Sequence, residues 1–429
     1  AMIRANIELR KFLKQTPEDK DLYQQLLKRN KDFCTIGVGY RARDIDTDEP
    51  IYDLHNTPHL YRDKHFYIIG ATGMGKTKLL ESLIAQDIDR GVGVAVIDPH
   101  GDLVDTIRGD MTFDVVYTQQ NEDPKKAKGK VEFVRKNVVV IDPTNPAGLV
   151  AFNPLEPIAG VDSDRIAEQV KLVFKKLWSD SWGYKMEDLL LNSLVALCEN
   201  QMTLVDLPRF LTDQDFRSRA MANVTNEICI IRFRQFDATS EAGRRDWIEP
   251  TLNKVNALLS NKKLRSMFGH KKSSFNLRDV IDTGKILLVR LDKGQMGESA
   301  YLLGSLILTQ IQNTAFGRSD IPDDQRGKFY LYIDEFQNFA TESFIDLLSE
   351  SRKYGLILTI AHQQLAQIPD RLQAAIFTNC NLHAYFRSSY SDAVVLAKEG
   401  LNIHYNKPPE ASGWVKKMNK MFEDDGFEP

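Results

Sequence analysis

The chain has 429 residues, of which 42% are hydrophobic and 27% charged, and its formal net charge is −3. This length allows two domains, or one large core with an insertion, and the charge balance neither requires nor excludes a nucleic-acid partner. The four cysteines are scattered without a C-x-x-C pair, which argues against a zinc site and fits a reduced, cytosolic setting. No apolar stretch approaches the roughly 20 residues that cross a bilayer, and no signal peptide is visible.

Residues 1–60 are expected to form an N-terminal segment, helical at first and then folded as a small β platform. Ten Lys or Arg lie between Arg4 and Arg43, which fits either a solvated helix face or a surface for a partner or nucleic acid. The opening Ala1-Met2 is typical of a tag scar, so we expect that a preceding segment has been removed.

The clearest motif is GATGMGKT at residues 70–77, which follows the apolar run 66–69 and precedes an amphipathic helical pattern. Its spacing matches the phosphate-binding P-loop, G-x-x-x-x-G-K-[ST]. Glycines there let several backbone N–H groups point into one concavity, and the helix that follows adds its positive N-terminal end. We therefore predict that a nucleotide binds to Gly70, Ala71, Thr72, Gly73, Met74, Gly75, Lys76 and Thr77. By analogy with other P-loops, Lys76 would reach the β- and γ-phosphates, and the Thr77 hydroxyl would bind Mg²⁺.

Short, continuous apolar runs alternate with helical patterns from Phe66 onward, which predicts an α/β fold whose parallel sheet is covered on both faces. The runs are 66–69, 92–97, 137–141, 286–291, 329–333, 356–360 and, more weakly, 382–386. Several runs end in an acid or another polar residue, among them Asp98, Asp142 and Asp292. Ligands bind beyond the carboxyl ends of such strands, so a set of acids there fits a crevice for a nucleotide with Mg²⁺. A single acid could equally be a turn residue.

Residues 158–280 interrupt this alternation with helical patterns and no convincing core strand, so we predict an inserted all-α domain. Basic clusters in it could contact nucleic acid or simply lie on solvated helix faces. A stretch rich in Pro and Lys at 121–136 predicts a surface excursion. The acidic tail, 411–429, is expected to be disordered.

An apolar strand pattern at 329–333 ends in two carboxylates, Asp334 and Glu335. Asp334 is predicted to bind Mg²⁺, directly or through water, and Glu335 to orient and deprotonate the water that attacks the γ-phosphate. A hydrolytic motor needs that second acid, whereas Glu335 could otherwise be a helix N-terminal acid. Gln363 follows the next strand and is predicted to contact the γ-phosphate or the attacking water. His362 is interpreted as a structural histidine.

These motifs together resemble the type IV secretion coupling proteins, the TraG/TraD-type conjugation ATPases of the FtsK–HerA class of P-loop motors. The residues that carry the resemblance are 70–77, 96–102, 152–155, 332–336 and 351–355, and the likeness extends over roughly residues 35–400. It implies a RecA-like core, formed by 61–157 and 281–410, that assembles into a hexameric ring. ATP would be bound between subunits, and DNA would pass through a central pore.

The resemblance also implies roles for single residues. Lys76 and Thr77 match the Walker A pair, Asp334 and Glu335 match the Walker B pair, and Gln363 matches the sensor glutamine. Arg352 matches the arginine that is supplied to a neighbour's ATP, with Arg387 as the alternative, although Arg352 could also be a surface charge. Relaxase and secretion-channel proteins are implied as partners.

Coupling proteins usually begin with transmembrane helices that this chain lacks. Membrane attachment is therefore expected only through an absent segment, at the cytoplasmic face of the inner membrane. Two other functions are left open: a related secretion ATPase for pilus assembly or protein export, and a slow, regulatory nucleotide-dependent interaction module. A small-molecule kinase fits less well, because it has no need of such a long helical insertion.

Overall fold

A computed structural model describes residues 33–43, 50–121, 124–145, 148 and 150–400. The predictions for residues 1–32 and for the tail at 411–429 lie outside these described residues. Among the described residues, no helix combines the length and the apolar character that a membrane span requires.

Seven strands form one sheet, in which every neighbouring pair is parallel. They are β3 (Phe66–Ile69), β4 (Gly93–Asp98), β5 (Val138–Ile141), β6 (Ile286–Arg290), β7 (Phe329–Ile333), β8 (Leu356–His362) and β9 (Leu382–Tyr385). Their order across the sheet is β5-β6-β4-β7-β8-β3-β9. All seven predicted strands are present, so the predicted α/β fold with a parallel sheet is confirmed.

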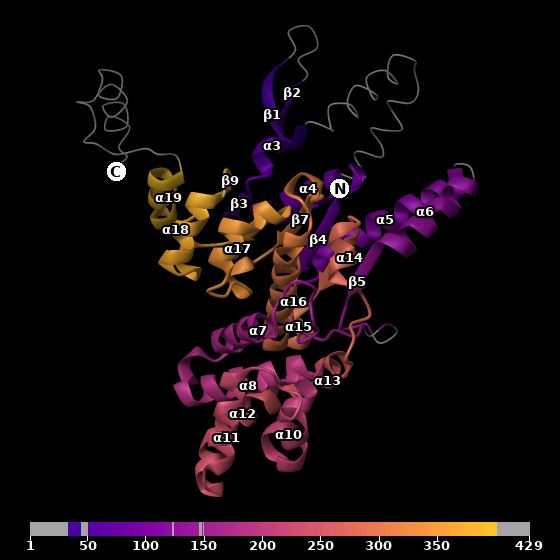
Figure 1. Ribbon diagram of the computed structural model, residues 1–429. Helices are drawn as coiled ribbons and strands as arrows, with labels where there is room; N and C mark the ends of the chain where they lie inside the picture. The colour runs from indigo at the N-terminus through magenta and orange to yellow at the C-terminus, as the bar shows by residue number, and fades with distance from the viewer. Residues whose placement is uncertain (1–32, 44–49, 122–123, 146–147, 149, 401–429) are drawn as a thin grey trace, which may run out of the picture.

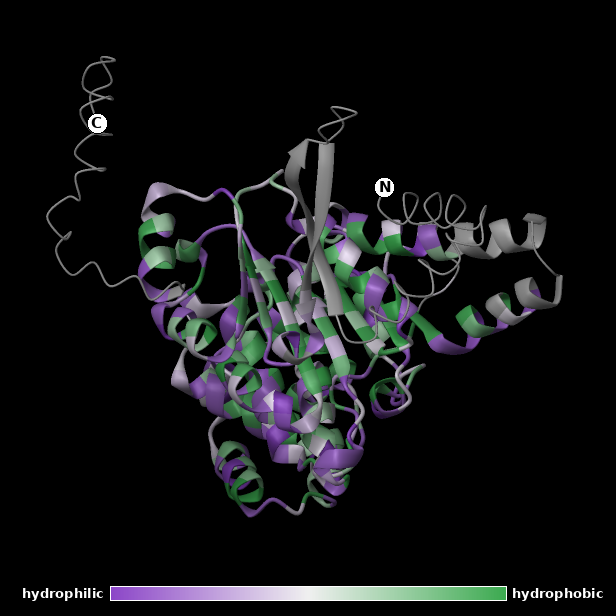
Figure 2. Cartoon of the chain, turned by 90° about the horizontal axis from the view of Figure 1, so that it is seen from above, coloured by the Kyte–Doolittle hydropathy of each residue, from purple (hydrophilic) through white to green (hydrophobic). Residues whose placement is uncertain are grey.

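The strands are apolar along their length because both faces of the sheet are covered (Figure 2). On β3, Phe66 and Ile68 join one apolar cluster with helices α4 (Lys76–Asp89) and α5 (Asp102–Asn121). The alternate residues, Tyr67 and Ile69, join a second, larger cluster on the opposite face. That face is packed by α16 (Glu298–Phe316), α17 (Phe344–Glu350) and α18 (Asp370–Asn379).

The described residues between 163 and 282 form helices and no strand, as predicted, and we call this segment the inserted block. Its α-helices are α7 (Ser163–Leu177), α8 (Tyr184–Glu199), α9 (Leu207–Thr212), α10 (Gln214–Met221), α11 (Glu227–Ala238), α12 (Glu241–Ser260), α13 (Lys262–Phe268) and α14 (Leu277–Asp282). Most of them extend from one end of the sheet (Figure 1). Helix α7 packs against α16, and one apolar cluster includes residues of both the inserted block and the sheet. The inserted block therefore shares its core with the sheet and the helices that cover it.

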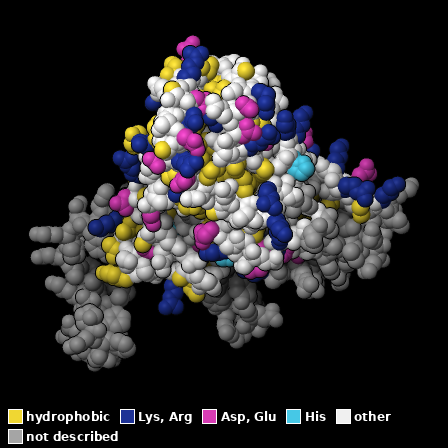
Figure 3. All heavy atoms as spheres, turned by 90° about the horizontal axis from the view of Figure 1, so that it is seen from below, with side chains coloured by type: hydrophobic (Ala, Val, Ile, Leu, Met, Phe, Trp, Pro, Cys, Tyr) yellow, Lys and Arg dark blue, Asp and Glu magenta, His cyan; other side chains and the backbone are white. Residues whose placement is uncertain are grey.

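Two arginines in the basic clusters of the inserted block have local partners. Arg232 lies 3.4 Å from a carboxylate oxygen of Asp188, and Arg244 donates to the backbone carbonyl of Asp237 at 3.0 Å. The end of the molecule that carries these helices shows Lys and Arg interspersed with Asp, Glu and apolar side chains (Figure 3). This mixture is typical of a solvated surface rather than of a continuous basic stripe.

The remaining elements lie around the sheet. The predicted β platform is an antiparallel hairpin of β1 (Phe33–Arg43) and β2 (Pro50–Pro58), followed by α3 (His59–Arg62). The predicted surface excursion at 121–136 is largely helix α6 (Pro124–Asn137), which packs on α5, and the pair projects from the sheet (Figure 1). Two short helices complete the fold, α15 (Lys293–Met296) and α19 (Tyr390–Val395).

A buried ion pair ties the helix after the P-loop to a central strand. Arg62 donates to both carboxylate oxygens of Asp87 on α4, at 3.0 and 2.7 Å, and to the hydroxyl of Tyr332 on β7 at 2.5 Å. Arg62 and Asp87 are 1% and 0% exposed, and Arg90 also donates to Asp87 at 3.0 Å. Removal of one partner would leave a buried charge without compensation.

We expect Asp87→Ala to lower the free energy of unfolding by about 3–5 kcal/mol, because Arg62 would stay buried as an uncompensated charge. Urea denaturation followed by circular dichroism measures this change. Glu241→Ala is the control, because Glu241 pairs with Arg245 on α12 and their side chains are 75% and 68% exposed. That substitution should cost less than about 1 kcal/mol. Equal losses for the two variants would contradict the importance of the buried pair.

Candidate functional site

The P-loop connects the buried strand β3 to helix α4. Gly73 and Gly75 have φ angles of 79° and 102°, in the left-handed region that favours glycine. Gly70 is constrained differently, because a Cβ there would lie 2.4 Å from Cβ of Phe386, just beyond β9. Helix α4 begins at Lys76, so its positive N-terminal end points at the loop. The segment therefore has the geometry of an anion cradle.

The side chains of the loop differ in their exposure and in their contacts. Lys76 is buried, and its Nζ donates to the backbone carbonyls of Gly70 at 2.7 Å and Ala71 at 3.3 Å. Thr77, in the first turn of α4, is partly exposed, while Thr72, Gly73 and Met74 are exposed at the tip of the loop. Lys76 is thus held over the loop, and the tip is open to a ligand.

Sheet order brings Asp334, Glu335 and Gln363 to the carboxyl-terminal end of the sheet, where the P-loop also lies. Strand β8 lies between β3 and β7, and all three strands point the same way. Gln363 follows β8, and its Nε2 donates to Oε1 of Glu335 at 2.8 Å. Glu335 has a φ angle of 47°, which is uncommon for a residue with a side chain and is typical of functional sites. The structure therefore brings Glu335 and Gln363 into direct contact.

The electrostatics of this edge favour a cation. Burial, together with the nearby carboxylates of Glu335 and Asp98, raises the pKa of Asp334 to about 6, although the hydrogen bond from the Glu335 N–H and the charge of Lys76 act in the opposite direction. Among the described residues no group of three or more His, Cys, Asp or Glu could hold a metal ion by itself. A Mg²⁺ ion here would take its remaining ligands from phosphate and water, which is how Mg²⁺ is commonly bound beside nucleotides. Asp334 and Thr77 fit such an ion.

His362 is a structural residue. It is fully buried, its Nε2 lies 2.6 Å from the hydroxyl of Tyr67, and burial lowers its pKa to about 3. A neutral imidazole in that position packs the sheet and has no charge to offer a phosphate.

The expectation that all the strand-end acids meet in one crevice is wrong for Asp142 and Asp292. They follow β5 and β6, which lie at the other side of the sheet from β3. Both face Arg290: its Nη1 lies 3.0 Å from an oxygen of Asp292 and 3.9 Å from one of Asp142. Asp142 also accepts from the backbone N–H of Thr144 at 2.9 Å, as a turn residue does.

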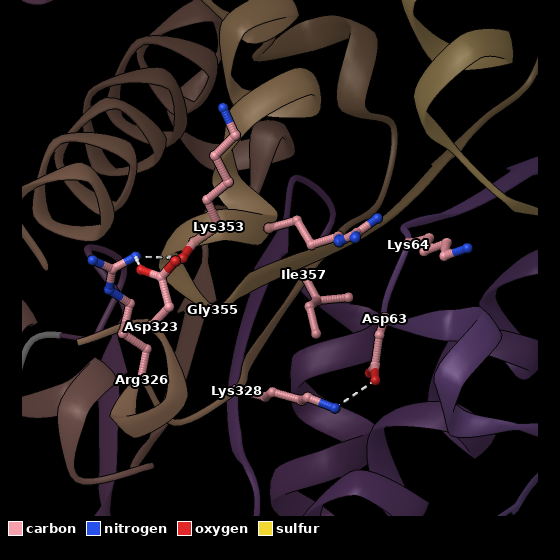
Figure 4. A pocket seen from close by; sticks show the side chains of 9 residues that line it. Asp63, Lys64, Asp323, Arg326, Lys328, Lys353, Gly355 and Ile357 are labelled. Carbon is pink, nitrogen blue, oxygen red and sulfur yellow. Dashed lines mark hydrogen bonds and ion pairs between the residues drawn. The ribbon is translucent and has the colours of Figure 1, made fainter. Parts of the chain in front are cut away.

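Arg352 lies just before strand β8, at the amino-terminal ends of the strands, whereas the P-loop lies at their carboxyl-terminal ends. It belongs to the turn that precedes β8, and it lines a cavity of about 250 Å³ together with Lys64, Lys328 and Lys353 (Figure 4). Strand β8 has seven residues, so the two edges are about 20 Å apart at 3.3 Å per residue. No side chain spans that distance, so Arg352 cannot reach a nucleotide in its own P-loop.

Arg387 lies on the P-loop side instead. It follows β9, its backbone carbonyl accepts from the Ala71 N–H at 2.8 Å, and the residue is exposed. The two candidate arginines therefore differ in where they can act. Arg387 adjoins the P-loop of its own chain, whereas Arg352 lies at the far end of strand β8.

The sequence patterns do not predict two residues of the site, Gln337 and Phe386. Gln337 donates from Nε2 to the second carboxylate oxygen of Glu335, Oε2, at 2.8 Å. Phe386 packs against Gly70 and fixes the start of the loop. The only sequence signal for Gln337 was its place two residues after Glu335, and none pointed to Phe386.

Comparisons with solved structures find the same fold. TrwBdeltaN70, a bacterial conjugative coupling protein in a trigonal form with sulphate, is 17% identical, with a TM-score of 0.54 over 86% of this chain and 82% of that chain. Its unbound monoclinic form is 17% identical, with a TM-score of 0.52 over 81% and 74% of the two chains. The plasmid coupling protein TrwB in complex with a non-hydrolysable GTP analogue is 18% identical, with a TM-score of 0.52 over 80% and 75%.

These likenesses show a shared RecA-like P-loop fold with an inserted all-α block. No curated protein sequence matches the chain. One family model, described as the type IV secretion-system coupling protein DNA-binding domain, matches residues 56–375. Since that match spans well over half of the sequence, the chain belongs to the type IV secretion-system coupling proteins.

Proposed function

We propose that this chain is an ATP-driven DNA translocase, a coupling protein that works as a hexameric ring in conjugative DNA transfer. The observation that carries the proposal is the convergence of the P-loop, Asp334, Glu335 and Gln363 at one edge of the sheet. The family, described by its DNA-binding domain, supports DNA as the partner. Relaxase and secretion-channel proteins are further partners that this function would require.

In this mechanism the P-loop backbone and Lys76 hold the phosphates, and Glu335 accepts a proton from the attacking water. Gln363 fixes one oxygen of Glu335 and would orient the same water from the neighbouring strand. Mg²⁺, bound through Thr77 and Asp334, would neutralise charge that develops on the phosphates. Low exposure of Glu335, at 7%, keeps its carboxylate in an environment where its hydrogen bonds are strong.

Arg352 would complete the site of a neighbouring copy, because the opposite edge of its own sheet is out of reach. An arginine supplied in trans stabilises the transition-state charge of phosphoryl transfer. Two different surfaces then meet at each interface, which is the head-to-tail arrangement that closes into rings.

Glu335→Gln should lower ATP turnover by about 10²–10⁴-fold, the contribution of a general base, while ATP still binds. Lys76→Ala should abolish turnover together with most of the affinity for ATP. Steady-state hydrolysis and binding of a non-hydrolysable ATP analogue measure the two effects. Glu249→Gln is the control, since Glu249 is exposed and lies on α12 of the inserted block. Parental turnover in Lys76→Ala would overturn the proposed site.

Arg352→Ala should lower turnover by about 10³-fold or more. A mixture of Arg352→Ala and Lys76→Ala proteins should regain part of the activity, because some interfaces then pair an intact P-loop with an intact Arg352. ATP hydrolysis across mixing ratios measures this recovery, with co-assembly checked by differently tagged copies. No recovery in co-assembled mixtures would contradict a shared site. Loss of turnover in Arg387→Ala but not in Arg352→Ala would assign the arginine to Arg387.

The rate of ATP turnover per subunit should rise with protein concentration, because the shared site needs assembly. It should rise further when DNA is added, because DNA binding completes the motor. Turnover is measured with single-stranded, double-stranded and no DNA, and DNA affinity is measured across salt concentrations. A steep salt dependence is expected for contacts to phosphates. Concentration-dependent turnover that DNA leaves unchanged would favour a secretion ATPase. Slow turnover, with partner binding altered by Glu335→Gln, would favour a regulatory module.

A further inference from the structure

Glu335 is held from two sides. Gln363 donates to its Oε1, and Gln337 donates to its Oε2, each at 2.8 Å. Gln363 belongs to the end of β8, whereas Gln337 belongs to the 3-10 turn Phe336–Asn338 that follows Glu335. A carboxylate with both oxygens bonded has a fixed orientation, so the lone pair that would accept a proton points one way only.

The turn that carries Gln337 is contacted by the inserted block. Lys176, near the end of α7, donates from Nζ to the backbone carbonyl of Gln337 at 2.9 Å. Among the described residues, no carboxylate lies within ion-pair distance of Lys176. Lys176 lines a cavity of about 260 Å³, to which Tyr301, Ser305 and Gln337 also belong, together with the carboxylate of Glu298 beyond ion-pair distance. Burial lowers the pKa of Lys176 to about 7, so the group is placed there at an electrostatic cost.

Glu335 needs such support because its backbone is in the left-handed region, with φ at 47° and ψ at 49°. A non-glycine residue holds that conformation only where its surroundings determine it. The backbone N–H of Glu335 donates to Asp334 at 3.0 Å, and its carbonyl accepts from Asn338 at 3.0 Å. The 3-10 turn is therefore part of what fixes Glu335, and Lys176 holds that turn from outside.

We propose that Lys176 and Gln337 are positioning residues for Glu335, through which the inserted block sets the rate of hydrolysis. The inference rests on the proposed function, since it assumes that Glu335 activates water. A displacement of α7 would move Lys176 and, with it, the backbone carbonyl of Gln337 to which Lys176 donates. The turn would then shift, and the Gln337 side chain would release Oε2 of Glu335. Neither residue touches the P-loop, so nucleotide binding does not depend on them.

The test compares Lys176→Met with Lys175→Met. The two lysines are neighbours on α7, but Lys175 is 41% exposed and faces Glu187 at 3.7 Å. Lys176→Met should lower kcat for ATP by up to about 10²-fold, the loss that a misplacement of about 1 Å can cause. KM and the affinity for a non-hydrolysable ATP analogue should stay at the parental value, and Lys176→Arg should restore most of kcat. Lys175→Met should behave like the parent.

A second variant separates positioning from general loss of structure. Gln337→Ala should lower kcat by a similar factor, and the double variant with Lys176→Met should be no slower than the slower single variant, because both act through Glu335. Multiplied effects in the double variant, or a parallel loss of ATP affinity, would overturn the positioning role. Parental kcat in Lys176→Met alongside an inactive Glu335→Gln would reject this inference and keep the proposed function. An active Glu335→Gln would reject both.

Discussion

The site depends on the parallel pairing of β8 with β3 on one side and β7 on the other. In register, Ile69 pairs with His362 and Ile333 with Ile360, so the three strands end at the same edge. That pairing brings the P-loop beside two acids that lie far along the sequence. The Arg62–Asp87–Tyr332 network reinforces it, because it joins α4, which starts at the P-loop, to β7, which ends at the acids. A shift of either strand would separate phosphate binding from water activation.

Local sequence patterns are sufficient to predict the strands of the sheet and the motifs at their ends. Seven apolar runs gave seven strands, because a strand buried on both faces leaves a continuous apolar signature whatever its neighbours are. Strand order leaves no such mark, so Asp142 and Asp292 were grouped with Asp334 although they lie at β5 and β6. Gln337 was missed because a 3-10 turn of three residues has no periodicity, and Lys176 because its helical pattern looks like that of any amphipathic helix.

Placement of Lys76 and Arg352 at opposite edges of one sheet constrains how copies could cooperate. One nucleotide cannot contact both edges of the same chain, so Arg352 can serve only a nucleotide held by another copy. A two-fold dimer would place like surfaces together, whereas an arginine supplied in this way needs unlike surfaces to meet. Such contacts leave a free surface at each end until a ring closes. The geometry of the sheet thus favours head-to-tail assembly, of which the proposed ring is the closed form, once Arg352 is given its proposed role.

The shared core of the inserted block explains how a helical insertion can bear on hydrolysis. A domain on flexible linkers could move without consequence for the sheet, but α7 packs against α16, which packs under the strands. Close-packed interiors transmit displacement because side chains have few voids to move into. Lys176 adds a polar contact from α7 to the turn after Glu335. The carboxylate of Glu335 is held separately by Gln363, on the neighbouring strand β8. A motion of the inserted block therefore has a short physical path to Glu335, which consists of two hydrogen bonds, from Lys176 to the carbonyl of Gln337 and from the Gln337 side chain to Glu335.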